Sequence, residues 1–509
     1  MRPHPDLSGT APKPTWLPIG LGSLLRLVQI WMPVLGVHSW RQADTAAMAR
    51  HFSLAGTPIW LPQVDWSGAS AGFVESEFPL YPFLVSRLYN LMGVQEWLGR
   101  GLSVLCSALT IWLVMRLGRR WFTPQVGWWA GMAFALAPLG VYYGRTFQAE
   151  ALLVLCAAGS LEAHSIFVER RKAWALSLSW ICFTGAALIK VIPLLWLGLP
   201  LLLVQLTPSP RAKAESPEQM LRRLLRLSLN PWFWVYVSTA LAVTSAWYVH
   251  AYQLGEASGL TFGFWGEDSD RSNIGLALNL SSWVNLAIRT GLRALVVTGV
   301  PLLMIGTMRC WRFGGGRIAL GGAVGMLICT VATMRSSTVH EYYQFPFLLF
   351  SSPLVGLGWQ TLQYKQRRWT IQMLLSITLI ASLSILSFDY WAVETRRLST
   401  WMPLAESIRK EIPVNARVVC VTDSDPTLLN LARRQGWIIP SRELTIDQLK
   451  KLKDDGASYL TGSLNWRNTY TPMQEAESNR IRELIQAHNI SFIDNKEKTY
   501  LIPIKNLIP

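Results

Sequence analysis

The chain alternates between long apolar runs and short polar connections over most of its length. Most runs hold about 20 residues, the length that a helix needs to cross the hydrocarbon core of a bilayer. We place them at 16–37, 98–116, 125–143, 149–167, 173–189, 191–206, 231–250, 290–308, 318–334, 345–362 and 370–388. The pattern therefore predicts an α-helical polytopic membrane protein with about 11 transmembrane helices.

The polar connections alternate in charge. Basic residues gather after the second, fourth and sixth runs, at 116–120, 169–172 and 207–228. Because short cytoplasmic loops carry an excess of Lys and Arg, these connections are expected on the inner face. The outer face then receives the long first loop, 38–97, and the turn that begins at Lys190. This assignment predicts a multi-pass protein of the cell (inner or plasma) membrane.

The first run contains a charge, Arg26. A charge near the centre of a membrane helix costs roughly 3 kcal/mol unless it finds a partner, so we expect a partner for Arg26 inside the bundle. The N-terminus is polar and rich in Pro, and no small-residue cleavage site follows the run. We therefore expect a retained helix rather than a signal peptide.

The character of the sequence changes at residue 390. Residues 1–389 form the predicted transmembrane domain, and 390–509 alternate strand-like and helical segments, which predicts a small α/β domain. An odd number of spans places this domain outside the cytoplasm. Strands are expected at 417–421, 437–439, 457–460, 490–493 and 499–504, and helices at 425–435, 446–453 and 471–487. The tail has no G-x-G-x-x-G motif, so we do not predict dinucleotide binding.

Composition agrees with a membrane protein. Of the 509 residues, 51% are hydrophobic and only 15% are charged, whereas soluble domains carry about 25% charged residues. The net charge of +16 would suggest a nucleic-acid partner in a soluble protein. Here the basic residues fall in the inner connections, so the expected partner is the lipid bilayer and not nucleic acid. Only Cys420 of the six cysteines lies in the tail, and no disulfide is expected there.

Acids, cations and aromatic residues gather in the connections assigned to the outer face. The acids are Asp44, Glu77 and Glu150. The cations and aromatic residues are Arg41, Arg145, Lys190, His340, Tyr342 and Tyr343. A carboxylate beside a low dielectric is costly, and such residues are usually functional or paired. Convergent acids beside cations are typical of a site where one acid acts as a base and the cations hold an anion.

Several of these residues also have a structural interpretation. Arg41 lies three residues before Asp44 and could form an ion pair with it at a helix end. The tyrosines could be interfacial anchors, and Lys190 could simply extend its ammonium into the interface. The acids are harder to explain in this way, because Asp44, Glu77 and Glu150 come from separate connections at the same depth.

Four motifs stand out in the same connections. They are W-R-Q-A-D-T-A at 40–46, E-x-E-F-P-L-Y-P at 75–82, Y-Y-G-R-T-F-Q-A-E at 142–150 and H-E-Y-Y-Q-F-P at 340–346. With these motifs the chain resembles the GT-C membrane glycosyltransferases, in the branch of the protein O-mannosyltransferase-like and aminoarabinose-transferase-like proteins. The resemblance covers most of residues 16–390. It implies that a sugar moves from a polyprenyl-phosphate carrier to a lipid, glycan or protein acceptor, with inversion of the anomeric centre.

The resemblance also implies roles for single residues. Asp44 matches the first-loop acid that serves as catalytic base, and Glu150 matches the acid of the second outer loop. Glu77 matches the acid before the proline and tyrosine of the first loop. Relatives in the aminoarabinose branch have a Lys directly after that acid, where this chain has Phe78. The contact with the carrier phosphate must therefore come from another residue.

The chemistry of such a transfer sets two requirements. An acceptor hydroxyl needs a carboxylate within about 3 Å to take its proton, and a leaving phosphate needs cations. The residues expected at the phosphate are Arg41, Arg145, Lys190, His340, Tyr342 and Tyr343. No cofactor is firmly expected, although a divalent metal ion held by Glu77 and Glu150 is an option that carboxylates alone do not establish.

Two other classes of protein remain open. A secondary transporter also buries charges, but we find no repeated halves or paired broken helices, and the acids gather at one face rather than at the middle of the membrane. A polysaccharide polymerase or ligase would share the carrier lipid and join different acceptors.

Overall fold

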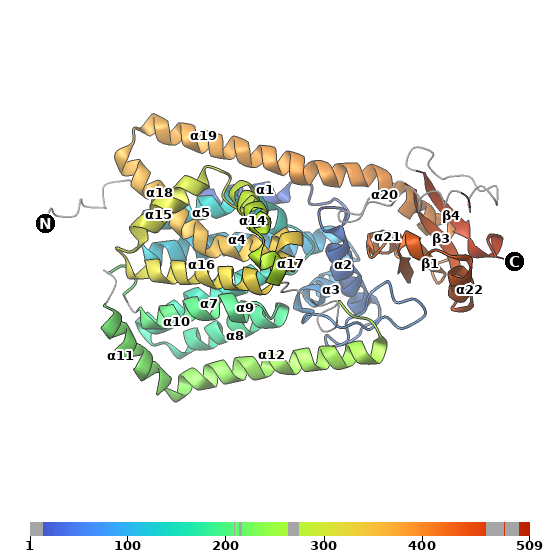
Figure 1. Cartoon of the computed structure of the whole chain (residues 1–509), viewed down its shortest axis with the longest axis horizontal. Coiled ribbons are helices and arrows are strands. Elements are labelled where there is room, and N and C mark those ends of the chain that lie inside the picture. Colours follow the sequence, from blue (N-terminus) through green and yellow to red (C-terminus); the bar gives the residue numbers. More distant parts are fainter. Residues whose placement is uncertain are drawn as a thin grey trace.

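The computed structural model describes residues 14–207, 209–212, 216–262, 274–464, 483 and 498–508. Helices lie side by side in a bundle, and a small sheet stands at one end of it (Figure 1). The bundle contains α1 (Trp16–Leu27), α4 (Glu96–Trp121), α5 (Pro124–Leu136), α6 (Pro138–Tyr143), α7 (Glu150–Arg170), α8 (Ala173–Ile189), α9 (Pro193–Trp196), α10 (Gly198–Leu206), α12 (Pro231–Ser258), α15 (Gly299–Cys310), α16 (Gly314–Ala332), α18 (Leu348–Lys365) and α19 (Arg368–Ile385). Every predicted apolar run overlaps at least one of these helices.

Further helices lie in the connections between the helices of the bundle. They are α2 (Ser39–Leu54), α3 (Leu80–Met92), α11 (Pro217–Ser228), α13 (Ile274–Leu278), α14 (Leu280–Arg289), η2 (Thr290–Ala294), α17 (Met334–Val339), η3 (Glu341–Phe347) and η4 (Leu386–Trp391). The first of these, α2, carries the W-R-Q-A-D-T-A motif.

Four helices in the described part of the chain are long and apolar enough to cross a membrane. They are α4, α7, α16 and the continuous helix Arg368–Glu411. A fifth span results if the bent pair Leu280–Ala294 and Gly299–Cys310 is counted as one. Other predicted runs form split or shorter helices; the run at 125–143, for instance, is divided at Pro138. The number of about 11 spans therefore stays a prediction.

The division at Pro138 explains how Arg26 is tolerated. Proline cannot donate a backbone hydrogen bond, so carbonyls at the end of α5 lose their helical partners. Arg26 is fully buried, and its guanidinium donates to the carbonyls of Phe134 at 3.4 Å, Ala135 at 3.3 Å and Gly140 at 2.9 Å. Pro138 stands four residues after Phe134 and leaves that carbonyl without its helical donor. The expected partner inside the bundle is confirmed, and it is a set of backbone carbonyls rather than an acid.

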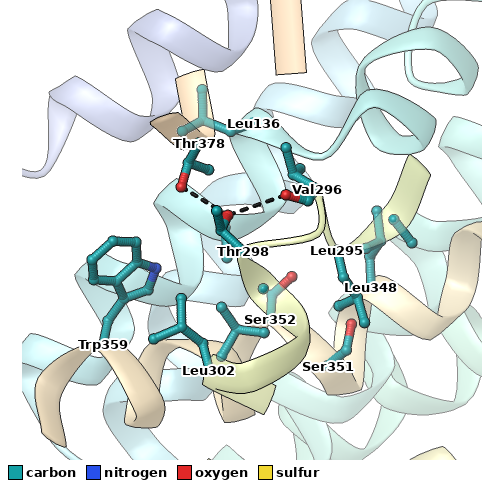
Figure 2. Close-up of a pocket in the computed structure, with 14 residues that line it drawn as sticks. Leu136, Leu295, Val296, Thr298, Leu302, Leu348, Ser351, Ser352, Trp359 and Thr378 are labelled. Atoms are coloured by element: carbon teal, nitrogen blue, oxygen red, sulfur yellow. Dashed lines mark hydrogen bonds between the residues drawn. The ribbon is translucent and has the colours of Figure 1, made fainter. Parts of the chain in front are cut away.

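A second break separates η2 from α15, and the helices on its two sides meet at 97°. Val296 and Val297 both have positive φ, 55° and 56°. Figure 2 shows Thr298 beside this break, with its hydroxyl 3.2 Å from the Val296 carbonyl and 2.8 Å from the Thr378 hydroxyl. Val296, Thr298 and Thr378 border a cavity of about 30 Å³, which has room for a single water molecule.

We expect Val297→Gly to raise the free energy of unfolding by about 1 kcal/mol, because a β-branched residue in the left-handed region is strained. The Val297 side chain is 53% exposed, so its removal sacrifices little packing. Val300→Gly is the matched control: Val300 is also exposed but lies inside α15, where glycine lowers stability. Thermal unfolding in detergent measures both, and a lower melting temperature for Val297→Gly contradicts the expectation.

The tail contains the predicted sheet. Its strands are β1 (Arg417–Val421), β2 (Gly436–Ile439), β3 (Ala457–Ser463) and β4 (Thr499–Pro503), in the order β2-β1-β3-β4. Strand β1 runs parallel to β2 and β3, and β4 is antiparallel to β3. Two helices, α21 (Thr427–Ala432) and α22 (Ile446–Asp454), match predicted ones. The predicted helix 471–487 and strand 490–493 lie outside the described residues, apart from residue 483.

The predicted domain boundary at 389/390 falls within a helix. The helix Arg368–Glu411 runs without interruption through α19, η4 and α20 (Ala392–Glu411). The last apolar helix therefore leads directly into the tail, as Figure 1 shows.

The tail packs against the first loop. The Gly68 N–H donates to the Gly436 carbonyl at 2.8 Å, and the Gly436 N–H donates to the Asp65 carbonyl at 3.0 Å. Asn430 adds a side-chain hydrogen bond to Glu96 at 3.2 Å. The loop and the tail therefore lie at the same end of the bundle, and α11 lies at the other end (Figure 1). Which end faces the cytoplasm stays a prediction.

Candidate active site

Asp44 lies in α2, in the first loop, and is only 3% exposed. Its Oδ1 atom accepts a hydrogen bond of 2.8 Å from the indole N–H of Trp66. Burial raises the pKa of Asp44 to about 8, although the Trp66 bond and the charge of Arg41 act in the opposite direction. The carboxyl group is therefore more basic than an ordinary aspartate, and it gains and loses its proton near pH 8.

Trp66 links the Asp44 carboxylate to the tail. The indole packs against two hydrophobic clusters, one in the first loop and one that includes Leu404 and Leu428 of the tail. Its ring also meets Phe262 edge to face, with 5.9 Å between the centroids. The position of the Asp44 carboxylate thus depends on the packing of the tail on the first loop.

Arg41 lies one helical turn before Asp44, but it forms its ion pair with Glu77. The two side chains are both mostly buried. Arg41 also interacts electrostatically with Asp44 and Glu150. The geometry contradicts a structural ion pair between Arg41 and Asp44, because the guanidinium points to another acid.

A second cation–acid pair lies beside the first. Glu150 is the first residue of α7, Lys190 follows directly after α8, and the Lys190 Nζ atom is 2.5 Å from Glu150 Oε1. The same ammonium lies 4.6 Å from the centroid of the Tyr342 ring and 5.0 Å from that of Tyr343. Lys190 also interacts with Glu77. An ammonium carries three N–H donors, of which Glu150 takes one.

His340 belongs to an aromatic group at the same place. Its ring lies 5.3 Å from Tyr342 and 5.6 Å from Trp40, measured between centroids. One member, His38, was not predicted, and its ring is 5.3 Å from both His340 and Tyr342. Burial and nearby arginine charges lower the pKa of His38 to about 3, so this imidazole is neutral at physiological pH. The only signal in the sequence is its place directly before the W-R-Q-A-D-T-A motif.

A cation from a predicted membrane run also lies here, and it was not predicted as a site residue. Arg293 lies in η2 and forms ion pairs with Glu341 and with Asp389, the latter at 3.0 Å. Glu341 also accepts a hydrogen bond of 2.9 Å from the Tyr143 hydroxyl. No pattern in the sequence indicates a role for Arg293 in the site. Arg293 comes close to Glu341 and Asp389 only because the chain bends between η2 and α15.

Arg145 does not join the other predicted residues. It is fully buried, and its Nη2 atom lies 2.5 Å from Oε2 of Glu394 in α20. Arg100 approaches the same carboxylate at 3.4 Å, and Arg145 also donates to the Gln29 carbonyl. Because a buried acid binds its guanidinium, we propose a structural role for Arg145 in place of the expected contact with phosphate.

The acids expected as metal ligands, Glu77 and Glu150, are each paired with a cation. Within the described residues, no three His, Cys, Asp or Glu side chains come together in a way that could hold a metal ion. These side chains suit a site that binds an anion through Arg41 and Lys190, and we assign no step to a metal.

Comparisons with known proteins concern the sequence and the fold. Residues 76–250 match the family model of the dolichyl-phosphate-mannose-protein mannosyltransferases. The fold is similar to that of ArnT from Cupriavidus metallidurans bound to undecaprenyl phosphate, with a TM-score of 0.63 and 14% identity over 97% of this chain and 98% of that one. It is also similar to the archaeal oligosaccharyltransferase AglB from Archaeoglobus fulgidus in complex with an inhibitory peptide and a dolichol-phosphate, with a TM-score of 0.52 and 12% identity over 89% and 69% of the two chains. A search of the curated proteins finds no match.

The fold is thus shared with these two structures over most of the chain, and residues 76–250 also match a mannosyltransferase family model. These findings support the resemblance to the GT-C membrane glycosyltransferases that the four motifs carry.

Proposed function

We propose that this protein is an inverting glycosyltransferase that moves a sugar from a polyprenyl-phosphate carrier to an acceptor at the outer face of the membrane. The observation that carries the proposal is the buried Asp44 carboxylate, of raised basicity, beside two cation–acid pairs at the end of an apolar bundle. The two similar structures, one bound to undecaprenyl phosphate and one to a dolichol-phosphate, support a lipid phosphate as the carrier.

Asp44 is the general base in this proposal. The acceptor hydroxyl attacks the anomeric carbon, and its proton passes to Asp44. The bond from the anomeric carbon to the phosphate oxygen breaks, and its electron pair leaves with the polyprenyl phosphate. One direct displacement of this kind inverts the anomeric centre and needs no covalent intermediate with the protein.

Lys190 and Arg41 stabilise the departing phosphate. Lys190 has N–H donors beyond the one that Glu150 takes, and preorganised cations favour a transition state in which negative charge develops. Phe78 stands where relatives of the aminoarabinose branch carry a Lys, and its N–H donates to the Leu188 carbonyl at 3.1 Å. The phenylalanine therefore lies next to the segment that presents Lys190, which supports Lys190 as the replacement cation.

Glu77 and Glu150 orient these cations. Each carboxylate holds one cation in place, and the rings of His340, Tyr342 and Tyr343 form a wall beside the Lys190 ammonium. The acids thus support binding of the carrier phosphate indirectly, and Asp44 alone exchanges a proton with the acceptor.

A transfer assay tests the proposal. The full chain is reconstituted in vesicles with a radiolabelled polyprenyl-phosphate sugar and an acceptor extract from host membranes. We expect label in the acceptor and an equal amount of free polyprenyl phosphate. Movement of unchanged label across the bilayer would instead identify a transporter. Transfer only from a polyprenyl-pyrophosphate glycan would identify a polymerase or ligase.

A further inference from the structure

A polar cavity of about 520 Å³ lies between the last turns of α4 and α7 and the connection 209–212. We call it the arginine cavity, because five arginines line it: Arg116, Arg119, Arg120, Arg170 and Arg211. Two glutamates, Glu162 and Glu169, are its acidic members. The lining therefore has an excess of three positive charges.

The arginine cavity is separate from the candidate active site. Helix α7 has 21 residues; it begins at Glu150 in the active site and ends at Arg170 in the cavity. A helix of this length spans about 30 Å, which is also about the thickness of the hydrocarbon core. The two sites therefore lie at opposite membrane surfaces.

One wall of the cavity is a fixed ion-pair network. Glu162 is almost completely buried and accepts hydrogen bonds of 2.8 Å from Arg116 and from Arg120. Glu169 forms a further ion pair with Arg120. These pairs neutralise much of the charge of Arg116 and Arg120 and hold both guanidinium groups in place.

The other arginines supply the excess charge. Arg119, Arg170 and Arg211 are exposed, and none of them forms an ion pair with a carboxylate of the described residues. The Nε atom of Arg211 donates to the Arg119 carbonyl at 3.0 Å, so the connection is attached to the end of α4. Three guanidinium groups around one concavity can bind the oxygens of a phosphate.

The surface beside the cavity suits acyl chains. The Arg116 guanidinium lies 5.0 Å from the ring of Trp112, which is 44% exposed on α4. Leu109 and Leu105 are also exposed and precede Trp112 at helical spacing, so an apolar stripe leads away from the arginines. An amphipathic ligand can place its anionic group among the arginines and its chains along this stripe.

We propose that the arginine cavity binds the phosphate headgroup of an anionic phospholipid from the leaflet opposite the active site. A soluble phosphate would use the same guanidinium groups but would gain nothing from the exposed stripe at Trp112. This site does not depend on the proposed glycosyl transfer.

Native mass spectrometry of the full chain in detergent tests the proposal with phosphatidylglycerol as the probe. We expect the triple variant Arg119→Gln, Arg170→Gln, Arg211→Gln to bind it on the order of 100-fold more weakly than the wild type. The matched control is Arg222→Gln, Arg223→Gln, Arg226→Gln, which removes the same charge from α11 at the same end of the bundle. We expect this control to keep nearly the affinity of the wild type.

Three results would overturn the proposal. Equal losses in the triple variant and its control would show general attraction to surface charge. Unchanged binding in the triple variant would leave the arginines as charges that complement the ends of their helices. Displacement of phosphatidylglycerol by millimolar inorganic phosphate would identify a soluble anion as the ligand.

The single variant Arg211→Gln is the alternative if the triple variant does not fold, because it changes only an exposed loop residue. If Arg211→Gln binds phosphatidylglycerol as tightly as the wild type does, that result also contradicts the proposal.

Discussion

Replacing Asp44 by Asn is expected to lower the turnover number by roughly 10²–10⁴-fold, the usual loss when a general base is removed. The yield of folded protein and the binding of the donor should stay close to those of the wild type. Asn keeps the size of Asp and an oxygen that can accept the hydrogen bond from the Trp66 indole.

The raised pKa of Asp44 explains why folding should survive this change. With a pKa of about 8, the folded protein holds Asp44 largely neutral at pH 7, and Asn is neutral as well. The unfolded chain loses this proton near the ordinary value for aspartate, which is about 4. The contribution of Asp44 to stability therefore falls as the pH rises from about 4 to about 8. Asn has no proton to lose in this range, so the stability of Asp44→Asn should not fall in the same way.

Turnover and folded yield distinguish catalysis from structure. The control is Asp425→Asn, the same chemical change at a buried aspartate whose side chain bonds to Thr427 in the tail and whose charge helps to raise the pKa of Asp44. We expect this variant to shift the pKa of Asp44 downward and to change turnover per folded molecule far less than Asp44→Asn does. Near-normal turnover of well-folded Asp44→Asn would contradict the proposed role, and Glu77 and Glu150 would be the next candidates for the base.

Lys190→Ala should raise the KM for the donor by about 10- to 100-fold, since a charge-assisted hydrogen bond contributes roughly 1.5–3 kcal/mol. It should also lower the folded yield, because Glu150 loses its buried partner, so the KM is measured on the folded fraction. Lys190→Arg retains the positive charge and should recover part of the affinity. Donor titrations at saturating acceptor measure both variants. An unchanged KM in Lys190→Ala would place the phosphate elsewhere.

Arg145→Gln should behave in the opposite way. Glu394 is fully buried, and Arg145 and Arg100 form its ion pairs. Removing one partner of a buried pair typically costs about 3–5 kcal/mol, so we expect little folded protein, and a normal KM in the fraction that folds. A well-folded Arg145→Gln protein with a raised donor KM would contradict the structural assignment of Arg145.

Local patterns were sufficient for most elements of the fold. Apolar runs and alternating strands depend on neighbours in the sequence, so the helices of the bundle and strands such as β1 and β3 could be predicted. The break at Val296 and Val297 was not predicted, because its residues of positive φ are valines and the nearby Gly299 and Pro301 lie within an otherwise apolar run. The division at Pro138 carries such a signal, and the buried Arg26 beside it could have indicated where its partners lie.

The members of the site were easier to predict than their pairings. The loops of one membrane face converge, so the gathering of Asp44, Glu77 and Glu150 near Lys190 followed from topology. The ion pair of Arg41 with Glu77, and not with Asp44, depends on how the first loop folds back on α2. Arg145 is an extreme case, because its partner Glu394 is 249 residues away, and no motif links the two.

The pH dependence of kcat/KM tests the role of Asp44 most directly, because it reports the pKa of the base in the free enzyme. With a pKa of about 8, kcat/KM should rise about tenfold per pH unit below that value and level off above it. Trp66→Phe removes a hydrogen bond that stabilises the carboxylate, so its midpoint should lie about one unit higher. A profile that stays flat from about pH 6 to about pH 9, or a midpoint that does not move in Trp66→Phe, would contradict Asp44 as the general base.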